Sequence, residues 1–160
     1  METNLPLITT AIWLSLFPLT FLIHFAEEYW VGEGYPAYLF RLRGTRLSEK
    51  RFIAFQTLNF GLFVAAGLIS YLLNFPEIMV VILSGLVLCN GITHTVTAIW
   101  DGRYGPGLIS SAFIWIPLGF ISIMLMFGHI SNTRLAIATL IGFAINGVVA
   151  LLTLRGGRFT

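Results

Sequence analysis

Charged side chains are scarce in this chain of 160 residues, since only 10% are Asp, Glu, Lys or Arg while 57% are hydrophobic. A soluble domain carries about 25% charged residues. The low charge, together with a mean hydropathy of +0.88, therefore predicts an integral membrane protein. The formal net charge of +2 is too small to indicate a nucleic-acid partner, and the length allows one domain, residues 1–160, without a second folded unit.

Cysteine is nearly absent, because Cys89 is the only one and lies inside an apolar run. No internal disulfide can form, and we expect Cys89 to be a small buried side chain. We also expect no cleavable leader. No basic residue precedes the first apolar run, and that run lacks a small-residue cleavage site. We interpret the run as a retained transmembrane helix.

Apolar runs of membrane-spanning length are abundant by contrast. A helix needs about 20 apolar residues to cross a bilayer. Five segments qualify, and they are residues 5–29, 52–73, 78–100, 108–127 and 135–154. The longest polar break, residues 30–51, contains a stretch over 37–42 that we expect to be a short interfacial helix. The sequence thus predicts an all-α bundle of five transmembrane helices.

The basic residues are distributed very unevenly over the predicted loops. An odd number of spans puts the two termini on opposite sides. Eight of the nine basic residues fall on one side: Arg41, Arg43, Arg46, Lys50, Arg51, Arg103, Arg155 and Arg158. Only Arg134 falls on the other side. Because basic loops stay in the cytoplasm, we expect the N-terminus outside and the C-terminus inside.

Ionisable groups within the apolar runs gather at one end of the predicted bundle. His24, Glu27 and Glu28 have i, i+3 and i+4 spacing, so one helix face presents an imidazole and two carboxylates. Such groups are costly near hydrocarbon, and a cluster of them indicates a functional site. A simpler interpretation is that Glu27 and Glu28 mark the point where the helix leaves the membrane.

A second polar stripe lies at the same predicted depth on the third span. Its members, spaced i, i+4, i+7 and i+11, are Asn90, His94, Thr97 and Asp101. Two histidines and carboxylates from facing helices are a common way to build a metal site in a bundle. We therefore expect His24 and His94 to face each other, with side-chain nitrogens within roughly 8 Å. Two alternatives stay open: His94 as a hydrogen-bonded packing residue, and Asp101 as a turn cap paired with Arg103.

Further polar residues are predicted at this level on the other spans. The predicted pocket residues are Asn59, Asn90, Thr97 and Asn146. In the last span small residues recur every four positions, at Ala138, Gly142, Asn146 and Ala150. This ridge should pack closely against a neighbouring helix and turn Asn146 inward. Interhelical hydrogen bonding alone is the alternative role for Asn59 and Asn146.

The run from His24 to Glu28 resembles the signature of the HXXEE family of small prokaryotic membrane proteins, both in its residues and in its position at the end of a first helix. The resemblance implies that His24, Glu27 and Glu28 act as a unit in a prokaryotic cytoplasmic membrane. It implies no particular activity. Adjacent glutamates also occur in the glutamate-type prenyl-protein proteases, but where those continue with an Arg this chain has Gly32. Five-helix sterol isomerases are similar in architecture only.

These patterns predict a metal-dependent membrane enzyme that acts on a lipid or isoprenoid-type substrate with bound zinc or iron. The predicted ligands are His24, Glu27, Glu28, His94 and Asp101. The predicted catalytic residues are Glu27, Glu28 and His94, with the unligated glutamate as base. Four alternatives stay open: a metal-free acid–base isomerase, a carrier of ions or of a small hydrophobic ligand, a haem protein with histidine axial ligands, and a purely structural or accessory protein. A carrier with five spans would have to dimerise, so a homodimer is a further open possibility.

Overall fold

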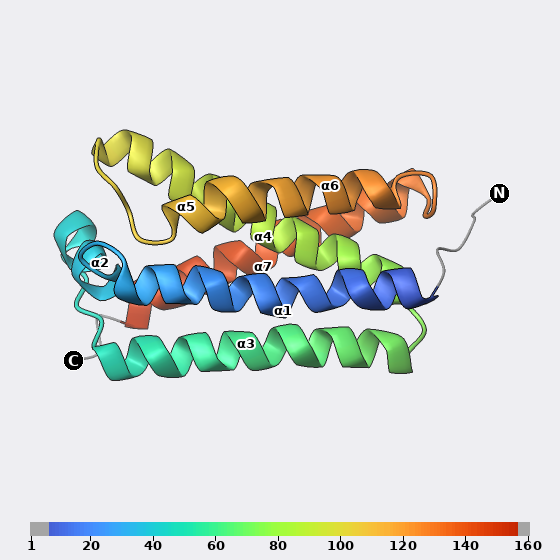
Figure 1. Ribbon diagram of the computed structural model, residues 1–160, viewed down its shortest axis with the longest axis horizontal. Coiled ribbons are helices and arrows are strands. Elements are labelled where there is room, and N and C mark those ends of the chain that lie inside the picture. Colours follow the sequence, from blue (N-terminus) through green and yellow to red (C-terminus); the bar gives the residue numbers. More distant parts are fainter. Residues whose placement is uncertain (1–6, 157–160) are drawn as a thin grey trace.

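The structure, a computed structural model, describes the backbone of residues 7–156 and the side chains of residues 9–153. Its elements in chain order are α1 (Leu7–Trp30), α2 (Tyr35–Arg43), α3 (Glu49–Leu72), α4 (Pro76–Asp101), α5 (Leu108–Ser110), η1 (Ser111–Trp115), α6 (Ile116–Met126) and α7 (Asn132–Gly156). The long helices lie side by side, and short α2 lies across one end of the bundle (Figure 1). The all-α prediction is confirmed.

Five helical segments are long and apolar enough to cross a membrane. They are Thr9–Trp30, Glu49–Leu72, Pro76–Asp101, Leu108–Met126 and Asn132–Thr153. Large apolar side chains such as Leu68, Phe113 and Leu140 are more than half exposed on their outer faces. Helices that are apolar on both their inner and outer faces are typical of membrane spans. The chain is therefore an integral membrane protein with five spans, as predicted.

The helix boundaries differ from the predicted ones because of local capping. α3 begins at Glu49, three residues early, because the Ser48 hydroxyl accepts a hydrogen bond from the Arg51 N–H and caps the first turn. α4 begins at Pro76, where a missing N–H costs little. The helix predicted over 37–42 is confirmed as α2, which runs from Tyr35 to Arg43. Residues 5 and 6 of the first predicted span lie outside the described residues.

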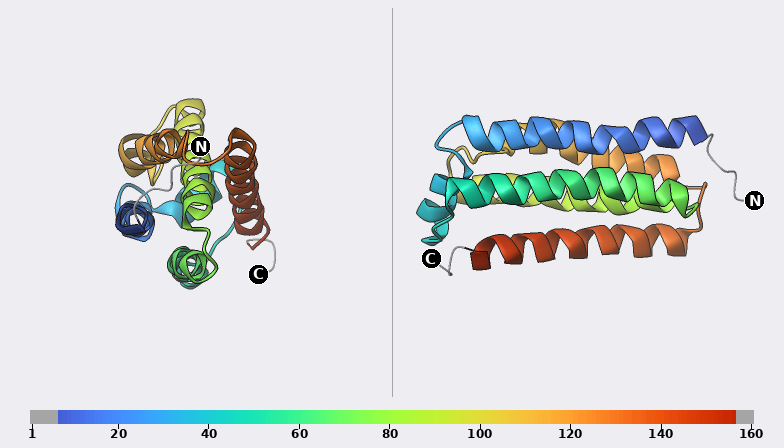
Figure 2. Two further views of the ribbon diagram at one scale, coloured as in Figure 1. Left: turned by 90° about the vertical axis from the view of Figure 1, so that its right-hand side faces the viewer. Right: turned by 90° about the horizontal axis from the view of Figure 1, so that it is seen from below.

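α4 is the central helix and contacts α1, α3, α6 and α7, as the end view in Figure 2 shows. Its contact with α7 is very close. A Cβ atom on Gly142 would lie 2.1 Å from the Ile82 carbonyl oxygen, and one on Gly85 would lie 2.5 Å from the Thr139 carbonyl oxygen. The predicted small-residue ridge therefore packs closely, and Asn146 on that ridge is only 4% exposed.

The fourth span contains a π-helical turn, η1, between α5 and α6. The Ile116 N–H donates to the carbonyl of Ser111, five residues earlier. Pro117 follows directly and has no N–H to continue an ordinary α-helical ladder. Turns of this kind are frequent at functional sites. This turn carries Trp115, which is 2% exposed.

The polar features of the chain gather at one end of the bundle. α2, the C-terminal end of α4 and the loop over 102–107 lie together there (Figure 1). Arg134 lies in the first turn of α7, at the opposite end. The Arg155 side chain and Arg158, both used to predict the orientation, lie outside the described part of the chain. The orientation of the bundle therefore stays a prediction.

Candidate functional site

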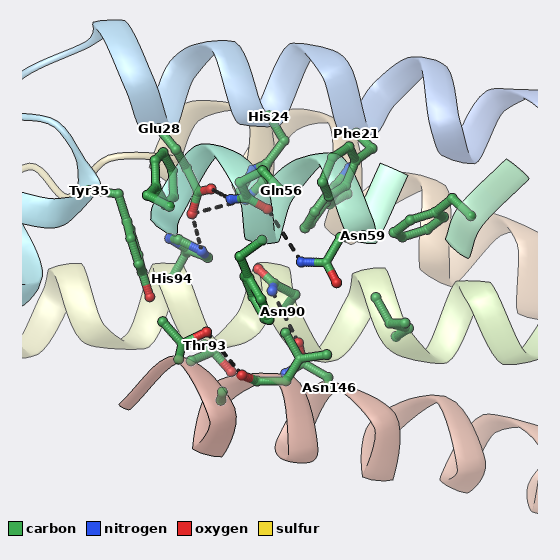
Figure 3. A pocket seen from close by; sticks show the side chains of 18 residues that line it. Phe21, His24, Glu28, Tyr35, Gln56, Asn59, Asn90, Thr93, His94 and Asn146 are labelled. Atoms are coloured by element: carbon green, nitrogen blue, oxygen red, sulfur yellow. Dashed lines mark hydrogen bonds and ion pairs between the residues drawn. The ribbon is translucent and has the colours of Figure 1, made fainter. Parts of the chain in front are cut away.

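Two histidines and one glutamate from two transmembrane helices meet inside the polar end of the bundle. His24 and Glu28 are one turn apart on α1, and His94 faces them from α4 (Figure 3). Glu28 Oε1 lies 3.6 Å from His24 Nε2 and 3.4 Å from His94 Nε2. The two imidazole rings are edge to face, with centroids 4.9 Å apart. The prediction that the histidines face each other is confirmed, since one ligand atom from each of the three residues lies within 4.8 Å of the others.

His24 is held by residues of the fourth span. Trp115 stacks on its imidazole with ring centroids 3.8 Å apart. The Ser110 hydroxyl lies 2.8 Å from His24 Nδ1 and donates to the Gly107 carbonyl at 3.3 Å. Because the hydroxyl proton is used on Gly107, the network assigns the imidazole proton to Nδ1, which donates to Ser110 Oγ. The Nε2 lone pair is then directed toward Glu28.

His94 is held by the loop between α4 and α5. Its ring donates a hydrogen bond to the carbonyl of Pro106, which has no N–H of its own. Tyr35 of α2 lies beside it, with ring centroids 6.2 Å apart. A histidine that donates one ring N–H to a fixed acceptor presents its other nitrogen to a ligand. Both histidines have this arrangement, through Ser110 in one case and through Pro106 in the other.

Glu28 is 4% exposed and is positioned by an amide from a third helix. Its Oε2 accepts a short hydrogen bond from Gln56 Nε2 of α3. Asn59 Nδ2 donates to Gln56 Oε1 at 3.4 Å and extends the polar chain along α3. In the described part of the chain the ion-pair partners of Glu28 are the two histidines, and neither a lysine nor an arginine.

Glu27 has a different role from the one predicted. Its carboxylate accepts hydrogen bonds from the backbone N–H groups of Ile109 at 2.7 Å and Ser110 at 2.6 Å, and from the Tyr104 hydroxyl at 2.6 Å. It thus caps the first turn of the fourth span, where free N–H groups and the helix dipole favour a negative charge. Consecutive residues on a helix point about 100° apart, so Glu28 faces α4 while Glu27 faces α5. Glu27, predicted as a ligand and a catalytic group, is not part of the three-residue cluster.

Gly107 forms one wall of the cluster. A Cβ atom there would lie 2.7 Å from His24 Cε1, 3.0 Å from His94 Cε1 and 3.1 Å from Glu28 Cγ. Its φ of +85° also favours glycine. We did not predict from the sequence that this loop reaches the site. The available signal was a Gly-Pro-Gly run directly after a helix that carries a histidine stripe.

Asp101 and Thr97 were predicted with the site, but the structure does not bring them to the cluster. Asp101 forms a bidentate pair with Arg41 at 3.1 and 2.8 Å, and Arg41 also donates to Glu33 at 2.8 Å. Thr97 donates to a carbonyl of its own helix at 2.6 Å. Asp101 lies seven residues beyond His94, or about 10 Å along the helix axis. It therefore anchors α2, and its expected pairing with Arg103 is replaced by the pair with Arg41.

A cavity of about 110 Å³ opens beside the cluster (Figure 3). Three predicted pocket residues line it, namely Asn59, Asn90 and Asn146. Asn90 Nδ2 donates to Asn146 Oδ1 at 3.0 Å, and Asn90 Oδ1 is buried without a hydrogen-bond partner. Phenylalanine rings form much of the remaining wall. The volume is enough for a few waters or a small organic group, but not for a whole lipid or a porphyrin.

Two tyrosines outside the spans lie near the site carboxylates. Burial, together with the Glu28 charge, raises the pKa of Tyr35, which lines the cavity. Burial and the hydrogen bond to Glu27 raise the pKa of Tyr104. Both phenols are therefore protonated at neutral pH, and Tyr104 donates its hydroxyl proton to Glu27. The sequence analysis assigned neither tyrosine to the site.

The cluster matches the donor set of known catalytic metal sites. Two histidines and a glutamate bind catalytic zinc in several hydrolases, and two histidines with one carboxylate bind non-haem iron. Donor atoms around a tetrahedral zinc with bonds of about 2.1 Å lie roughly 3.4 Å apart. The two contacts of Glu28 with the histidines, at 3.6 and 3.4 Å, have this spacing.

Comparison with known proteins identifies a family and no activity. The model of a family described as proteins of unknown function with an HXXEE motif matches residues 15–124, which include the whole cluster. No curated protein and no solved structure matches the chain. The chain therefore belongs to the HXXEE-motif family, and its chemistry has to be inferred from the site.

Proposed function

We propose that this member of the HXXEE family is a metal-dependent membrane enzyme in which His24, Glu28 and His94 bind one zinc or iron ion. The observation that carries the proposal is the approach of Glu28 Oε1 to both Nε2 atoms, at 3.6 and 3.4 Å. A buried carboxylate with neither a lysine nor an arginine beside it is costly unless another cation neutralises it. A divalent ion between these three donors meets that requirement.

The surrounding residues support this use of the cluster. The ion, when bound, would polarise a substrate oxygen or lower the pKa of a water molecule. Ser110 and the Pro106 carbonyl orient the two imidazoles, and Gln56 holds the second oxygen of Glu28. Outer contacts of this kind typically change metal affinity by about 10–100-fold.

The structure changes the proposed acid–base roles. Both oxygens of Glu27 are used to cap α5, and Glu28 is the sole carboxylate among the described residues that line the cavity. We therefore assign Glu28 to the metal and leave no free glutamate as base. Tyr35, which is protonated and lines the cavity, is the candidate proton donor to a leaving or developing oxyanion.

The proposed substrate is a lipid or isoprenoid-type molecule. The cavity admits only a small reacting group, so the rest of the molecule stays outside the bundle. Aromatic walls suit a hydrocarbon segment, while the Asn90 oxygen without a partner suits a hydroxyl or N–H donor on the substrate. By the predicted orientation, the reaction takes place on the inner side of a prokaryotic cytoplasmic membrane.

The contact between Glu28 and His94 also favours a second function, a metal-free acid–base isomerase. At 3.4 Å the carboxylate and the imidazole can share one proton. A proton held there could be delivered to one carbon of a substrate double bond. The pair could then remove a proton from another carbon of the same molecule, which shifts the double bond. This alternative uses the same residues and differs only in the absence of an ion.

Metal content of the full-length protein purified in detergent decides between the two functions. The proposal predicts close to one equivalent of zinc or iron per chain in the wild type, and loss of most of it in Glu28→Gln and His94→Ala. Glu77→Gln is the matched control, because Glu77 lies at the opposite end of the bundle, in the first turn of α4. If the wild type binds neither zinc nor iron with a Kd below the micromolar range, the metal-dependent function is overturned and the isomerase is favoured.

A further inference from the structure

A second hollow, of about 940 Å³, lies outside the bundle between the end of α2 and the outer face of α4. Ile92, Val96 and Trp100 form its apolar wall. Their four-residue spacing places them in one row that runs from the end of α4 toward its middle. They are 43%, 53% and 87% exposed, respectively. A row of exposed apolar side chains on a membrane helix is a natural contact for a hydrocarbon chain.

The other side of the hollow is polar and basic. Arg43 and Thr45, at the end of α2 and just beyond it, line it together with Asp101. The Asp101 carboxylate is already neutralised by its bidentate pair with Arg41. Arg43 is exposed and forms no ion pair with any of the side chains described from residue 9 to residue 153. Arg43 is therefore a basic side chain without an ion pair, and it lies next to an apolar row.

The hollow and the metal cavity share one residue. Thr93 lines both, and it immediately precedes His94 on α4. A molecule lying in the hollow therefore has a part of its length beside the cavity that contains the cluster. No other residue lines both spaces in the described part of the chain.

We propose that the hollow binds a membrane-resident amphiphile with a phosphate headgroup. The guanidinium of Arg43 would bind the phosphate, since its N–H groups match paired phosphate oxygens. The hydrocarbon chain would lie along Ile92 and Val96. Resting on the proposed function, this molecule is the substrate, and the part of its chain that lies between Ile92 and Val96 passes the metal cavity at Thr93.

The test is equilibrium binding of dodecyl phosphate to the full-length protein in a neutral detergent. We expect saturable binding. Arg43→Gln should weaken it by about tenfold or more, because the variant loses one charge-assisted contact. Arg46→Gln is the matched control, because Arg46 lies near Arg43 but over the Phe40 ring and does not line the hollow. Dodecanol and inorganic phosphate should each bind at least about tenfold more weakly, because each lacks one half of the amphiphile.

The Glu28→Gln variant separates this inference from the proposed function. It should lose metal and still bind dodecyl phosphate as the wild type does. Loss of phosphate binding together with metal would mean that the headgroup binds at the cluster, which contradicts the role of the hollow. The proposal would also be overturned if the wild type and Arg43→Gln bound dodecyl phosphate with equal affinity. It would be overturned as well if dodecanol or inorganic phosphate bound the wild type as tightly as dodecyl phosphate does. Thermal unfolding of each variant checks that it is folded.

Discussion

Glu28 on α1 and His94 on α4 are 66 positions apart in the chain, and Glu28 Oε1 lies 3.4 Å from His94 Nε2. The neighbouring Glu27 instead binds the first turn of the fourth span. Because consecutive residues on a helix point in different directions, the two adjacent carboxylates of α1 lie in different environments. Glu28 faces two imidazoles, while Glu27 fixes the helix that supports them. This division of roles determines how variants of the site should behave.

Glu28→Gln should mainly reduce metal binding, whereas Glu27→Gln should mainly reduce stability. Glu28→Gln keeps the side-chain shape but removes the charge that a cation requires, so we expect loss of metal with little change in thermal stability. Glu27→Gln weakens the cap of α5 and should lower stability by about 1–2 kcal/mol. Its metal affinity should fall only by the roughly 10–100-fold typical of supporting residues.

Metal content and thermal unfolding in detergent, measured on the same two preparations, check this prediction. Glu27 would regain its predicted role as a ligand if its amide variant lost metal completely while unfolding at the wild-type temperature.

Gly107→Ala should disrupt the cluster directly. The added methyl group would lie 2.7 Å from His24 Cε1, and alanine is also disfavoured at a φ of +85°. Gly44→Ala is the matched control, because Gly44 has a φ of +66° and nothing within 4 Å of the added atom. Both variants should lose about 1 kcal/mol from backbone strain. Only Gly107→Ala should also lose metal, as measured by metal content after dialysis.

Ser110→Ala should loosen the orientation of His24. Without the hydroxyl, Nδ1 loses its acceptor at 2.8 Å, and the tautomer with a free Nε2 is no longer favoured. We expect metal affinity to fall by about 10–100-fold while the helices stay intact. Ser84→Ala is the comparison, since Ser84 is equally buried but donates to a carbonyl of its own helix. Competition with a chelator of known affinity measures the difference, and equal affinities in the two variants would exclude the role of Ser110.

Asp101→Asn should leave the metal site unchanged. Asp101 pairs with Arg41 at the end of the bundle, so its loss releases α2 and not a ligand. Ion pairs near the protein surface contribute little to stability, and we expect only a small decrease in stability. Limited proteolysis should cut the segment around α2 faster in the variant. A drop in metal content with unchanged proteolysis would return Asp101 to the ligand set.

Much of the fold and half of the site could be predicted from the sequence, because both depend on periodicity within one helix. The i, i+4 spacing of His24 and Glu28 fixes their shared face, and span lengths fix the depth at which His94 meets them. The small-residue ridge likewise predicted the position of Asn146, which hydrogen bonds to Asn90. These are consequences of helix geometry alone.

The rest depends on how different segments approach each other, which no single-helix pattern contains. Glu27 is used by a helix terminus more than 80 positions away, and the contact follows from the path of the loop before α5. Gly107 and Ser110 matter only because that loop folds back onto the cluster. Asp101 shares one face of α4 with His94, but it lies seven residues farther along the axis and pairs with Arg41 instead of joining the cluster.

Titration of the metal-free protein with Co²⁺, followed by visible absorption, is the most direct test of the central claim. Cobalt replaces zinc in nitrogen and oxygen sites, and its absorption reports the coordinating atoms. The account predicts saturation near one equivalent, a spectrum lost in His24→Ala, Glu28→Gln and His94→Ala, and a spectrum retained in Glu27→Gln. Absence of a bound spectrum in the wild type, or an unchanged spectrum in Glu28→Gln, would contradict it.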